Sequence, residues 1–533
     1  MKSDESHKRL SLKEFVWLGF NYAVGIGFIG NFAILSNIGK PNSIGINAIW
    51  VYLLIGFVAG NCAWAFAKLS RIHNSDNNGG AYIYVRTTFG RFWGWLVGFM
   101  QYACLPFVVT IQVMMLIRGT FSPEFISNGQ PQWYSANWGP FSDLYLDFIG
   151  IFIYMISASV IFAGIKIYKK MAHTTSIIKW LTAGFLVIAG ISLAITNGSS
   201  NWNYWTTEST FSFAGFMNTF TSCFFFFAGF EIFSTAGKNV NNPEKNIGKG
   251  ITLIMIIMTI FYVVISLIFF LGYRVFVQNM NMGAWSPFTS KIIIYGGPII
   301  IIISGLALKI NIAMQNALYG GTTLQPLSKE GYISNKLFNL NKDGIPVKAA
   351  VINLIVTSVM LILWLVIPDL IKGIWLVSHP DQQYSSAFNV ANLSSAFSVI
   401  TMFIYIMVLI TVLKLALDKK LKLNWYEKNT FPFILVTLGL MFVWHYYSII
   451  YDAVTATDSS AIVAMVIELV FILSNVIFAI TWYFAYYYKK YKIRLKTNPN
   501  LQVELNSEFT FNLEHQAKLA KWEMFSNLCN LQK

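Results

Sequence analysis

The chain has 533 residues, of which 56% are hydrophobic and only 11% are charged. A soluble globular domain carries roughly 25% charged residues, so the composition excludes an ordinary soluble protein and indicates a polytopic membrane protein. The net charge of +15 would suit a nucleic-acid partner, but the basic residues gather in alternate loops, which is the pattern of membrane topology instead.

Twelve apolar stretches are long enough to cross a bilayer, because a spanning helix needs about 20 mostly apolar residues. In chain order they lie at 15–37, 47–69, 93–118, 145–164, 173–196, 212–236, 250–272, 293–318, 347–367, 388–415, 430–451 and 460–487. Helices satisfy their own backbone hydrogen bonds, which lipid cannot do, so the predicted fold class is an all-α membrane protein. The charged N-terminus, 1–14, precedes an apolar run too long for a signal peptide, so we expect the first span to be retained.

The loops between the spans alternate sharply in basic content. The loops after spans 2, 4, 6, 8 and 10 carry many lysines and arginines, such as Lys68, Lys166 and Lys420. The opposite loops and span ends hold Lys40, Arg118, Arg274, Lys291 and Lys372. Because basic loops stay in the cytoplasm, both termini are predicted to be cytoplasmic, in a multi-pass protein of the plasma membrane. The basic tail, 488–533, would be a solvated segment or an amphipathic helix on the membrane surface, and the basic surplus favours contact with anionic lipids.

A glycine pattern in the first span admits two interpretations. Residues 25–30 read Gly-Ile-Gly-Phe-Ile-Gly, which matches the G-x-G-x-x-G of dinucleotide-binding loops. That interpretation needs an acidic residue about 20 positions later, and no Asp or Glu occurs between Glu14 and Asp76. The alternative is a helix that is interrupted inside the membrane, because glycine tolerates an unwound backbone.

Span 6 contains a matching feature. Gly229 lies in the middle of this span, two residues before Glu231, as Gly25 and Gly27 lie in the middle of span 1. Small residues in membrane helices often serve helix packing, which is the simpler interpretation. Interrupted helices at corresponding positions of two halves, however, mark a transporter site at the bilayer midplane, where free N–H and C=O groups can bind a zwitterion. We therefore favour a binding site.

Several short motifs follow one another between residues 10 and 415. They are Gly25-Ile26-Gly27-Phe28, Ala67-Lys68-Leu69, Asn78-Gly79-Gly80-Ala81-Tyr82-Ile83-Tyr84, Phe89-Gly90, Phe227-Ala228-Gly229-Phe230-Glu231, Val240-Asn241-Asn242-Pro243, Lys329-Glu330-Gly331 and Ile345-Pro346-Val347. In this order they resemble the amino acid–polyamine–organocation (APC) transporter superfamily. The resemblance implies a transporter domain at 15–487, made of two inverted five-helix repeats, 15–196 and 212–415, with discontinuous helices 1 and 6, and of spans 11 and 12 at 430–487.

The resemblance also implies that the chain carries amino acids or amines by alternating access, through proton symport or through exchange. The substrate carboxylate would meet the backbone N–H groups of Ile26 and Gly27. The substrate ammonium would meet the carbonyls of Ala23, Phe225 and Ala228. Phe225 would serve as a gating aromatic or as an ordinary core or lipid-facing phenylalanine. The expected substrate-binding residues are Ala23, Gly25, Ile26, Gly27, Phe225, Ala228, Gly229 and Asn316.

The sequence departs from the family pattern at three places. Ile26 replaces a small hydroxyl residue that would add a donor beside the carboxylate. Lys238-Asn239 stands where relatives often carry acidic residues, and Thr322 stands near a common arginine. These changes leave open whether the inner gate keeps the ion pairs of the family.

Ionisable residues inside spans are costly, so each one is a functional hypothesis. Glu231 is expected to support the unwound segment by accepting hydrogen bonds, with direct proton carriage as the alternative. Lys179 in span 5 stands where, by the resemblance, some proton-coupled relatives place a lysine that occupies an ion site and bridges spans 1 and 8. The alternative for Lys179 is a lysine that snorkels to the cytoplasmic surface.

Lys309 lies about two-thirds along span 8 and seven residues before Asn316, so both residues share a helix face. Since the resemblance places Asn316 near the substrate, we expect Lys309 about 10 Å outward from it, in the outer vestibule. There it would select anionic amino acids such as glutamate, pair with a carboxylate such as Asp147, or line the vestibule as a polar group.

Other classes of function fit less well. A membrane-embedded enzyme would need convergent His, Cys or acidic groups, but among the histidines only His445 lies well inside a span, and no metal-ligand spacing occurs. A channel would show a selectivity ring or a polar pore face, and a non-transporting receptor is a more distant alternative. The phosphate-binding motif GxxxxGKS/T does not occur, so an ion or substrate gradient would drive transport. We expect proton-coupled amino acid uptake, with exchange as the alternative, by a monomer or homodimer that has no cofactor, metal or nucleic-acid partner.

Overall fold

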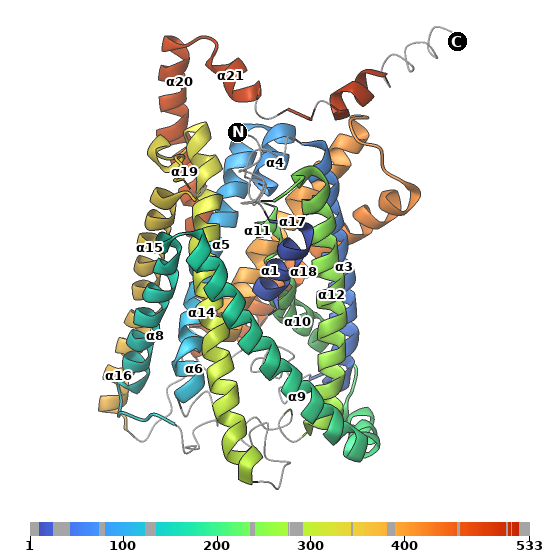
Figure 1. Ribbon diagram of the computed structural model, residues 1–533, viewed down its shortest axis with the longest axis vertical. Coiled ribbons are helices and arrows are strands. Elements are labelled where there is room, and N and C mark those ends of the chain that lie inside the picture. The colour runs from blue at the N-terminus through green and yellow to red at the C-terminus, as the bar shows by residue number, and fades with distance from the viewer. Residues whose placement is uncertain are drawn as a thin grey trace.

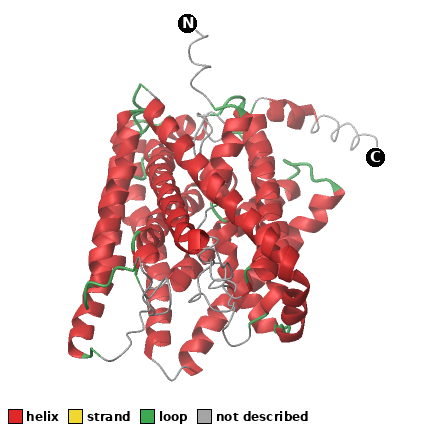
Figure 2. Ribbon diagram, turned by 60° about the horizontal axis from the view of Figure 1, so that its bottom comes forward, coloured by secondary structure: helices red, strands yellow, loops and turns green. Residues whose placement is uncertain are grey.

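The computed structural model describes residues 10–24, 43–73, 80–122, 135–234, 240–274, 277, 291–342, 345–380, 390–455, 459–507, 510–512 and 514–521. Throughout these residues the chain folds into helices joined by short connections, and no ribbon is drawn as a strand (Figure 2). The β-type pairings among them are two isolated bridges, Leu10 with Val240 and His73 with Phe511. A helical fold is what lipid demands, because each helix pairs its own backbone groups.

Ten helical runs in the described part are long and apolar enough to cross a membrane. They contain α3 (Ala48–Ile72), α5 (Arg91–Leu116), α8 (Ser142–Ser159), α9 (Ile165–Glu208), α12 (Pro243–Gly272), α14 (Lys291–Glu330), α15 (Val347–Leu361) continued by α16 (Ile367–Ser378), α17 (Val390–Leu417), α18 (Trp425–Thr455) and α19 (Ser459–Trp482). These runs coincide with predicted spans 2–5 and 7–12. The all-helical membrane fold is therefore confirmed, whereas the twelve-span topology and its inverted repeats stay predictions.

Spans 1 and 6, in which interruptions are predicted, are not among the ten runs found in the described residues, and residues 25–37 of span 1 lie outside those residues. α1 (Leu12–Ala23) has 12 residues, and α10 (Phe213–Cys223) has 11 residues. α10 runs into one 3-10 turn, Phe224–Phe227, which is followed by α11 (Phe230–Phe233). The remaining short helices used below are α4 (Ala81–Phe89), α6 (Arg118–Phe121), α20 (Tyr488–Thr497) and α21 (Leu501–Ser507).

One helix extends well beyond the apolar stretch that predicts it. α9 ends at Glu208 rather than at position 196, because polar side chains fasten its end to α12. Asn201 Nδ2 donates to the Leu271 carbonyl at 2.6 Å, and Trp205 Nε1 donates to the Phe270 carbonyl at 2.9 Å. Hydropathy therefore locates the lipid-facing part of this helix and not its polar end.

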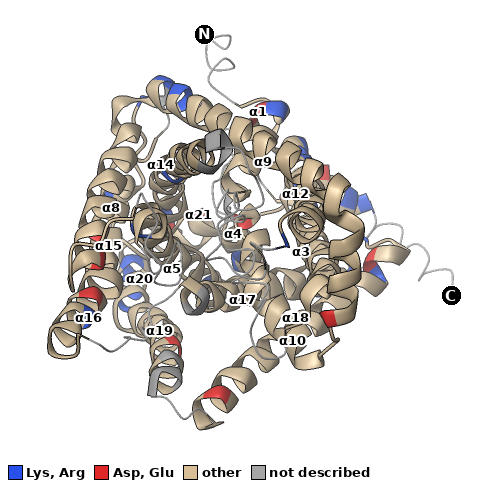
Figure 3. Cartoon of the chain, turned by 90° about the horizontal axis from the view of Figure 1, so that it is seen from below, with Lys and Arg blue, Asp and Glu red and all other residues tan. Residues whose placement is uncertain are grey.

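Helix contacts divide the bundle into two groups joined by shared helices. α1 and α3 pack on α12, whereas α5, α8 and α15 pack on α14. α9 touches both α12 and α14, and α17 touches both α3 and α5. The most apolar stretch of α5 is 83% buried and that of α17 is 78% buried, against 22% for α18 and 17% for the run that contains α19. α5 and α17 therefore lie centrally and α18 and α19 at the rim, in a bundle whose ribbon carries few charged residues (Figure 3).

A buried ion network, here called the Arg118 network, joins α6, α8 and α16 at the end of the molecule opposite α4 (Figure 1). Arg118 Nη1 lies 2.8 Å from Asp369 Oδ1 and 3.3 Å from Asp147 Oδ2. Arg118 Nη2 lies 3.3 Å from Asp143 Oδ2, which also binds Lys372 Nζ at 2.8 Å. All five side chains are buried, so their charges depend on one another rather than on water.

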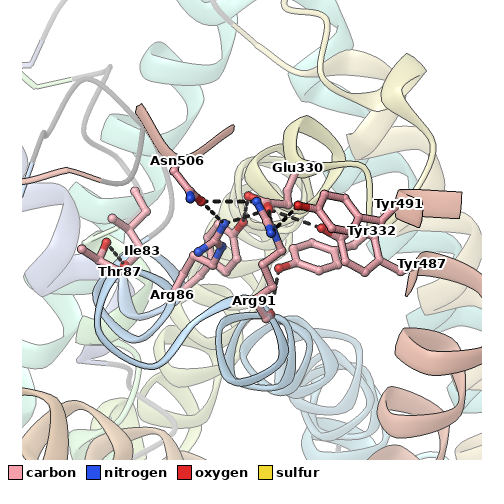
Figure 4. A network of polar contacts seen from close by, with 10 residues as sticks. Ile83, Arg86, Thr87, Arg91, Glu330, Tyr332, Tyr487, Tyr491 and Asn506 are labelled. Atoms are coloured by element: carbon pink, nitrogen blue, oxygen red, sulfur yellow. Dashed lines mark hydrogen bonds and ion pairs between the residues drawn. The ribbon is translucent and has the colours of Figure 1, made fainter. Parts of the chain in front are cut away.

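A second network, here called the Glu330 network, joins α4, α5, α14, α20 and α21 at the other end (Figure 4). Glu330 Oε1 accepts hydrogen bonds from Arg91 Nε at 2.9 Å and from Arg86 Nη2 at 3.1 Å. Asn506 Oδ1 of α21 accepts from both arginines at 3.2 Å. Arg91 Nη1 also donates to the Tyr491 hydroxyl of α20 at 2.6 Å. Residues far apart in the sequence thus share one buried carboxylate.

The sequence leaves open whether the inner gate keeps the ion pairs of the family. The Glu330 network supplies ion pairs at the end of the molecule that contains α4. The Thr322 hydroxyl, which stands near a common family arginine, donates to the Tyr319 carbonyl at 3.1 Å. Lys238 and Asn239 lie outside the described residues. Among the described residues, the ion pairs at this end include those of Glu330, at the end of α14, with Arg86 and Arg91, and that of Lys68 in α3 with Glu427 at the start of α18.

The C-terminal segment docks on the same end of the molecule. Phe511 forms its bridge with His73, just beyond α3, and the Asn512 N–H donates to the carbonyl of the last α3 residue at 2.9 Å. His515 Nε2 lies 2.7 Å from the Lys420 carbonyl, in the connection between α17 and α18. The described part of the tail thus contacts the protein through Phe511, Asn512 and His515. A solvated segment or membrane-surface helix stays a prediction for the tail, since residues 522–533 lie outside the described residues.

His73 is a titratable group that this docking covers. The side chain is 1% exposed, and its Nδ1 donates to the Leu69 carbonyl at 2.9 Å. The rings of Tyr84 and Phe511 lie 5.1 Å and 5.2 Å away, and His515 is a further titratable group close enough to act on it. Burial lowers the pKa of His73 to about 4, so the ring is neutral while the tail is docked.

We predict that docking of the tail weakens as the pH falls from about 6.5 toward 4. An undocked His73 regains a pKa of about 6.5 and takes up a proton in this window, whereas the docked ring stays neutral, so protonation favours undocking. Hydrogen-exchange protection of the Asn512 amide should fall over this range in the wild type but not in His73→Phe. The same pH dependence in both proteins would contradict the role of His73.

We also predict that Arg118→Met lowers the free energy of unfolding by about 3–5 kcal/mol, because it leaves buried carboxylates without their guanidinium. Thermal or chemical unfolding of the purified protein in detergent measures the change. The matched control is Lys414→Met, which removes an i,i+4 ion pair with Asp418 whose lysine side chain is 47% exposed. Its effect should stay within about 0.5 kcal/mol, and equal losses in the two variants would refute the special role of the buried network.

Candidate functional site

The interrupted helices meet at one cavity of about 130 Å³. Its wall is built by the end of α1, the connection between α10 and α11, and residues of α5, α12, α14 and α17. Four of the expected substrate-binding residues line it, namely Ala23, Phe225, Ala228 and Gly229, and Lys309 lines it as well. The structure therefore brings the end of α1 and the break in span 6 together around one space.

The break in span 6 occurs at Ala228 and Gly229. After the 3-10 turn, Ala228 adopts an extended backbone with ψ of 162°, and Gly229 has φ of +108°, a conformation that side chains other than glycine rarely adopt. Glu231 Oε2 accepts a hydrogen bond from the Gly229 N–H at 2.9 Å and another from the Tyr405 hydroxyl at 2.7 Å. The buried carboxylate thus pairs a backbone group that the break would otherwise leave free.

The end of α1 is held by Lys179 of α9. Its Nζ donates to the carbonyls of Asn21 at 2.9 Å and Val24 at 2.8 Å, which belong to the last turn of α1 and its cap. An ammonium at this place is favourable, because a helix C-terminus carries unpaired carbonyls and partial negative charge. Lys179 is 2% exposed, so it does not snorkel to the surface.

The expected bridge from Lys179 to span 8 takes a different form. The described hydrogen bonds of Lys179 reach span 1, and span 8 is tied to span 5 by another side chain. Asn311 Nδ2 of α14 donates to the Ala172 carbonyl of α9 at 2.8 Å and to Thr175 Oγ1 at 2.7 Å. Lys179 therefore connects spans 1 and 5, and Asn311 connects spans 5 and 8.

Asn316 lies one layer behind the cavity rather than in its wall. Its Oδ1 accepts a hydrogen bond from the Tyr22 hydroxyl at 2.8 Å, and its Nδ2 donates to Gln112 Oε1 at 2.7 Å. Tyr22 and Gln112 do line the cavity. Asn316 therefore positions two wall residues, Tyr22 and Gln112, that the sequence did not single out. Tyr22 directly precedes the predicted site residue Ala23, and this adjacency is the sequence signal that could have pointed to it.

Tyr262 of α12 is a further residue that sequence reasoning missed. Its hydroxyl lies 3.3 Å from the Ala23 carbonyl of span 1 and 2.9 Å from the Phe226 carbonyl of span 6, so it joins both interrupted segments. The side chain is buried and lines the cavity. A single tyrosine in the apolar run of span 7 gives no distinctive pattern in the sequence, since its role comes from contacts across the bundle.

Lys309 has partners other than the carboxylate suggested by the sequence. Its Nζ donates to the Met115 carbonyl, to the Leu116 carbonyl at 3.2 Å and to Thr120 Oγ1 at 3.1 Å. Asp147, the expected partner, belongs to the Arg118 network instead. Lys309 therefore fastens α14 to the end of α5 and presents its charge to the wall of the cavity.

Some predicted residues are not placed by the structure. Gly25, Ile26 and Gly27 lie outside the described residues. Within the part of the chain that is described, no group of three or more His, Cys, Asp or Glu side chains is arranged to hold a metal ion. His445, considered for an enzyme, contacts Glu468 between α18 and α19, away from the cavity wall.

Comparison with known proteins gives a consistent result. A family model described as amino acid permease matches residues 23–498. The chain is 24% identical over 195 residues to cationic amino acid transporter 4 of Homo sapiens, which covers 35% of this chain and 30% of that protein. It is 22% identical over 355 residues to the vacuolar cationic amino acid transporter 2 of Arabidopsis thaliana, covering 64% and 53%. It is 21% identical over 262 residues to the branched-chain amino acid permease BcaP of Lactococcus lactis subsp. cremoris, covering 46% and 53%.

The chain spans between 30% and 53% of the length of these relatives, and their names refer to two kinds of substrate. The family model covers far more, from the end of α1 to the end of α20. It also includes all described residues of the cavity wall except Tyr22. The resemblance carried by the sequence motifs is confirmed: the chain belongs to the amino acid permease family of the APC superfamily.

Proposed function

We propose that this permease is a secondary active transporter that moves amino acids by alternating access around its interrupted spans 1 and 6. Membership of the family supports amino acid transport by a multi-pass membrane protein rather than catalysis. The observation that carries the proposal is that the end of α1 and the break before α11 face one cavity, each held by a buried ionisable side chain. Backbone groups at such breaks bind a zwitterion without needing ionised side chains in the wall.

The substrate ammonium is proposed to bind at the carbonyls of Ala23, Phe225 and Ala228. Ala23 and Phe225 each accept one weak hydrogen bond within the protein, at 3.3 Å from Tyr262 and at 3.4 Å from the Ala228 N–H. A carbonyl oxygen has two lone pairs, so both groups can accept from a ligand as well. Gly229 provides the positive φ of +108° at the break, a backbone conformation that L side chains rarely adopt.

Proton coupling is proposed to act through Lys179. Its described contacts are neutral carbonyls, so it can release a proton without breaking an ion pair. Loss of the charge weakens its hold on the end of α1, since a charged donor forms stronger hydrogen bonds than a neutral one. A change at Lys179 is thereby transmitted to a wall of the cavity, which is what coupling of a proton to substrate movement requires.

Exchange of one amino acid for another is the alternative mechanism, and a channel or receptor is more distant. We further propose a plasma-membrane protein with both termini cytoplasmic, built from repeats at 15–196 and 212–415, as a monomer or homodimer in contact with membrane lipids. The names of the relatives include cationic and branched-chain amino acids, so similarity leaves the substrate class open.

Uptake of a labelled amino acid mixture into proteoliposomes tests the proposal, with an inward proton gradient and no sodium. Wild-type uptake should follow the gradient, and Lys179→Met should reduce gradient-driven uptake by about tenfold or more. Lys170→Met is the matched control, because Lys170 is an exposed lysine of the same helix, and it should behave as the wild type.

The outcomes separate the mechanisms. Uptake that needs vesicles preloaded with amino acid would show exchange and would return Lys179 to a structural role. The melting temperature of the wild-type protein shows whether it is folded. If the folded wild type shows neither uptake nor counterflow, the transporter proposal is refuted.

A further inference from the structure

We infer that the cavity accepts neutral amino acids with apolar side chains and rejects cationic ones, and that Lys309 sets this preference. The inference rests on the proposed function, because it concerns the substrate of the same site. It draws on the chemistry of the described cavity wall. This wall contains Lys309 and no carboxylate, whereas a wall that binds lysine or arginine needs a negative charge.

The wall is largely hydrocarbon. α5 contributes Leu105, Val108 and Ile111, and α14 contributes Leu308 and Ile312. Phenylalanines of spans 6 and 10 complete it. Such a surface gains free energy when it covers an apolar side chain, whereas an ionised side chain placed against it loses its water without compensation.

The polar wall groups are mostly engaged by the protein itself. The Tyr22 hydroxyl donates to Asn316, and the Tyr262 hydroxyl lies against the carbonyls that join the interrupted segments. Gln112 Oε1 accepts from Asn316 Nδ2. These bonds position the wall, and they leave it with little polar surface to offer an ionised side chain.

No carboxylate lines the cavity among the residues that the structure describes. Glu231 is the acidic residue of the nearby break, and its Oε2 is taken by the Gly229 N–H and the Tyr405 hydroxyl. A lysine or arginine substrate would therefore find no counter-ion in this part of the site. Burial of an unpaired cation is strongly unfavourable.

The wall carries a positive charge instead. Thr120 Oγ1 donates its hydrogen to the Leu116 carbonyl at 3.0 Å, so toward Lys309 Nζ it can act only as an acceptor. The other two partners of Lys309 are carbonyls, which also only accept. Three acceptors surround the amino group, and the ammonium is the form that can donate to all three.

This charge discriminates among substrates. It repels a second cation in the cavity, because charges beside an apolar wall interact more strongly than charges in bulk water. An acidic side chain would meet the charge of Lys309 but no free N–H group, because all three are donated to α5 and α6. A neutral apolar side chain meets neither penalty, so leucine, isoleucine, valine, methionine and phenylalanine are the expected substrates.

The test is a competition panel in proteoliposomes, combined with ligand-induced rises in melting temperature of the purified protein. In the wild type, neutral apolar amino acids should compete for uptake and stabilise the protein. Lysine, arginine and glutamate should do so with at least about tenfold weaker apparent affinity. Lysine, arginine or glutamate acting as well as leucine would overturn the inference.

A pair of variants at Gln112 tests the charge itself. Gln112→Glu has nearly the same shape, can still accept from Asn316, and brings the charge of the described wall from +1 to 0. It should improve the affinity for lysine relative to leucine by about tenfold or more, whereas the apolar control Gln112→Met should not. Lys309→Met reaches the same wall charge by another route and should shift the same ratio in the same direction. An unchanged ratio in folded Gln112→Glu would refute the electrostatic basis.

Failure of the inference can be told apart from failure of the proposed function. If the wild type transports cationic or acidic amino acids, the transporter proposal stands and the substrate inference falls. If no amino acid is transported, stabilisation by neutral apolar ligands alone would still support the substrate inference. Absence of both transport and stabilisation would overturn both.

Discussion

Backbone N–H and C=O groups cannot be left unpaired inside a bilayer, and this constraint governs the centre of the molecule. A binding site made from interrupted helices needs some unpaired backbone groups that a ligand can bind. The side chains that hold each interruption must therefore pair some of its free backbone groups and leave others for the ligand. Glu231 accepts from the Gly229 N–H in span 6, and Lys179 donates to the last carbonyls of α1. The two charges are opposite because the two segments present opposite backbone groups.

The rest of the structure keeps these partners in place. Tyr262 ties both interrupted segments to α12, and Asn316 fixes Tyr22 against Gln112 from behind. Lys309 joins α14 to the end of α5. At the two ends of the bundle, the Glu330 network joins α5 and α14 of the cavity wall to α4, α20 and α21, and the Arg118 network joins α6, α8 and α16.

The sequence predicts some of this arrangement well. Long apolar stretches locate the ten complete spans, because lipid imposes helix on any such stretch. The glycines of spans 1 and 6 predict where the helices are interrupted, and Gly229 does mark a break with a left-handed backbone. The presence of Glu231 and Lys179 inside the membrane indicates their importance, since buried charge is retained only where it has a task.

Other features could not be predicted, because they arise from residues brought together by the fold. Tyr22 and Asn316 are 294 positions apart, and Arg91 and Asn506 are 415 apart. Asp147 is one of the alternatives that the sequence offers for Lys309, since a carboxylate is an expected neighbour of a buried lysine; the sequence cannot show that carbonyls at the end of α5 lie closer. The length of α9 was underestimated for a related reason, as its polar end is stabilised by α12 rather than by lipid.

The docked tail has a consequence for the turnover rate of the proposed transport rather than for its substrate preference. Asn506 binds arginines of α4 and α5, while the chain around Phe511 lies on the end of α3, so the tail straddles the two groups of helices. If the proposed alternating access moves these groups relative to each other, the movement stretches or releases the tail. The barrier to opening at this end then includes contacts made wholly outside the cavity. A lipid, a protein or a covalent modification that captures the tail would act as an accelerator, changing turnover while the preference among substrates stays the same.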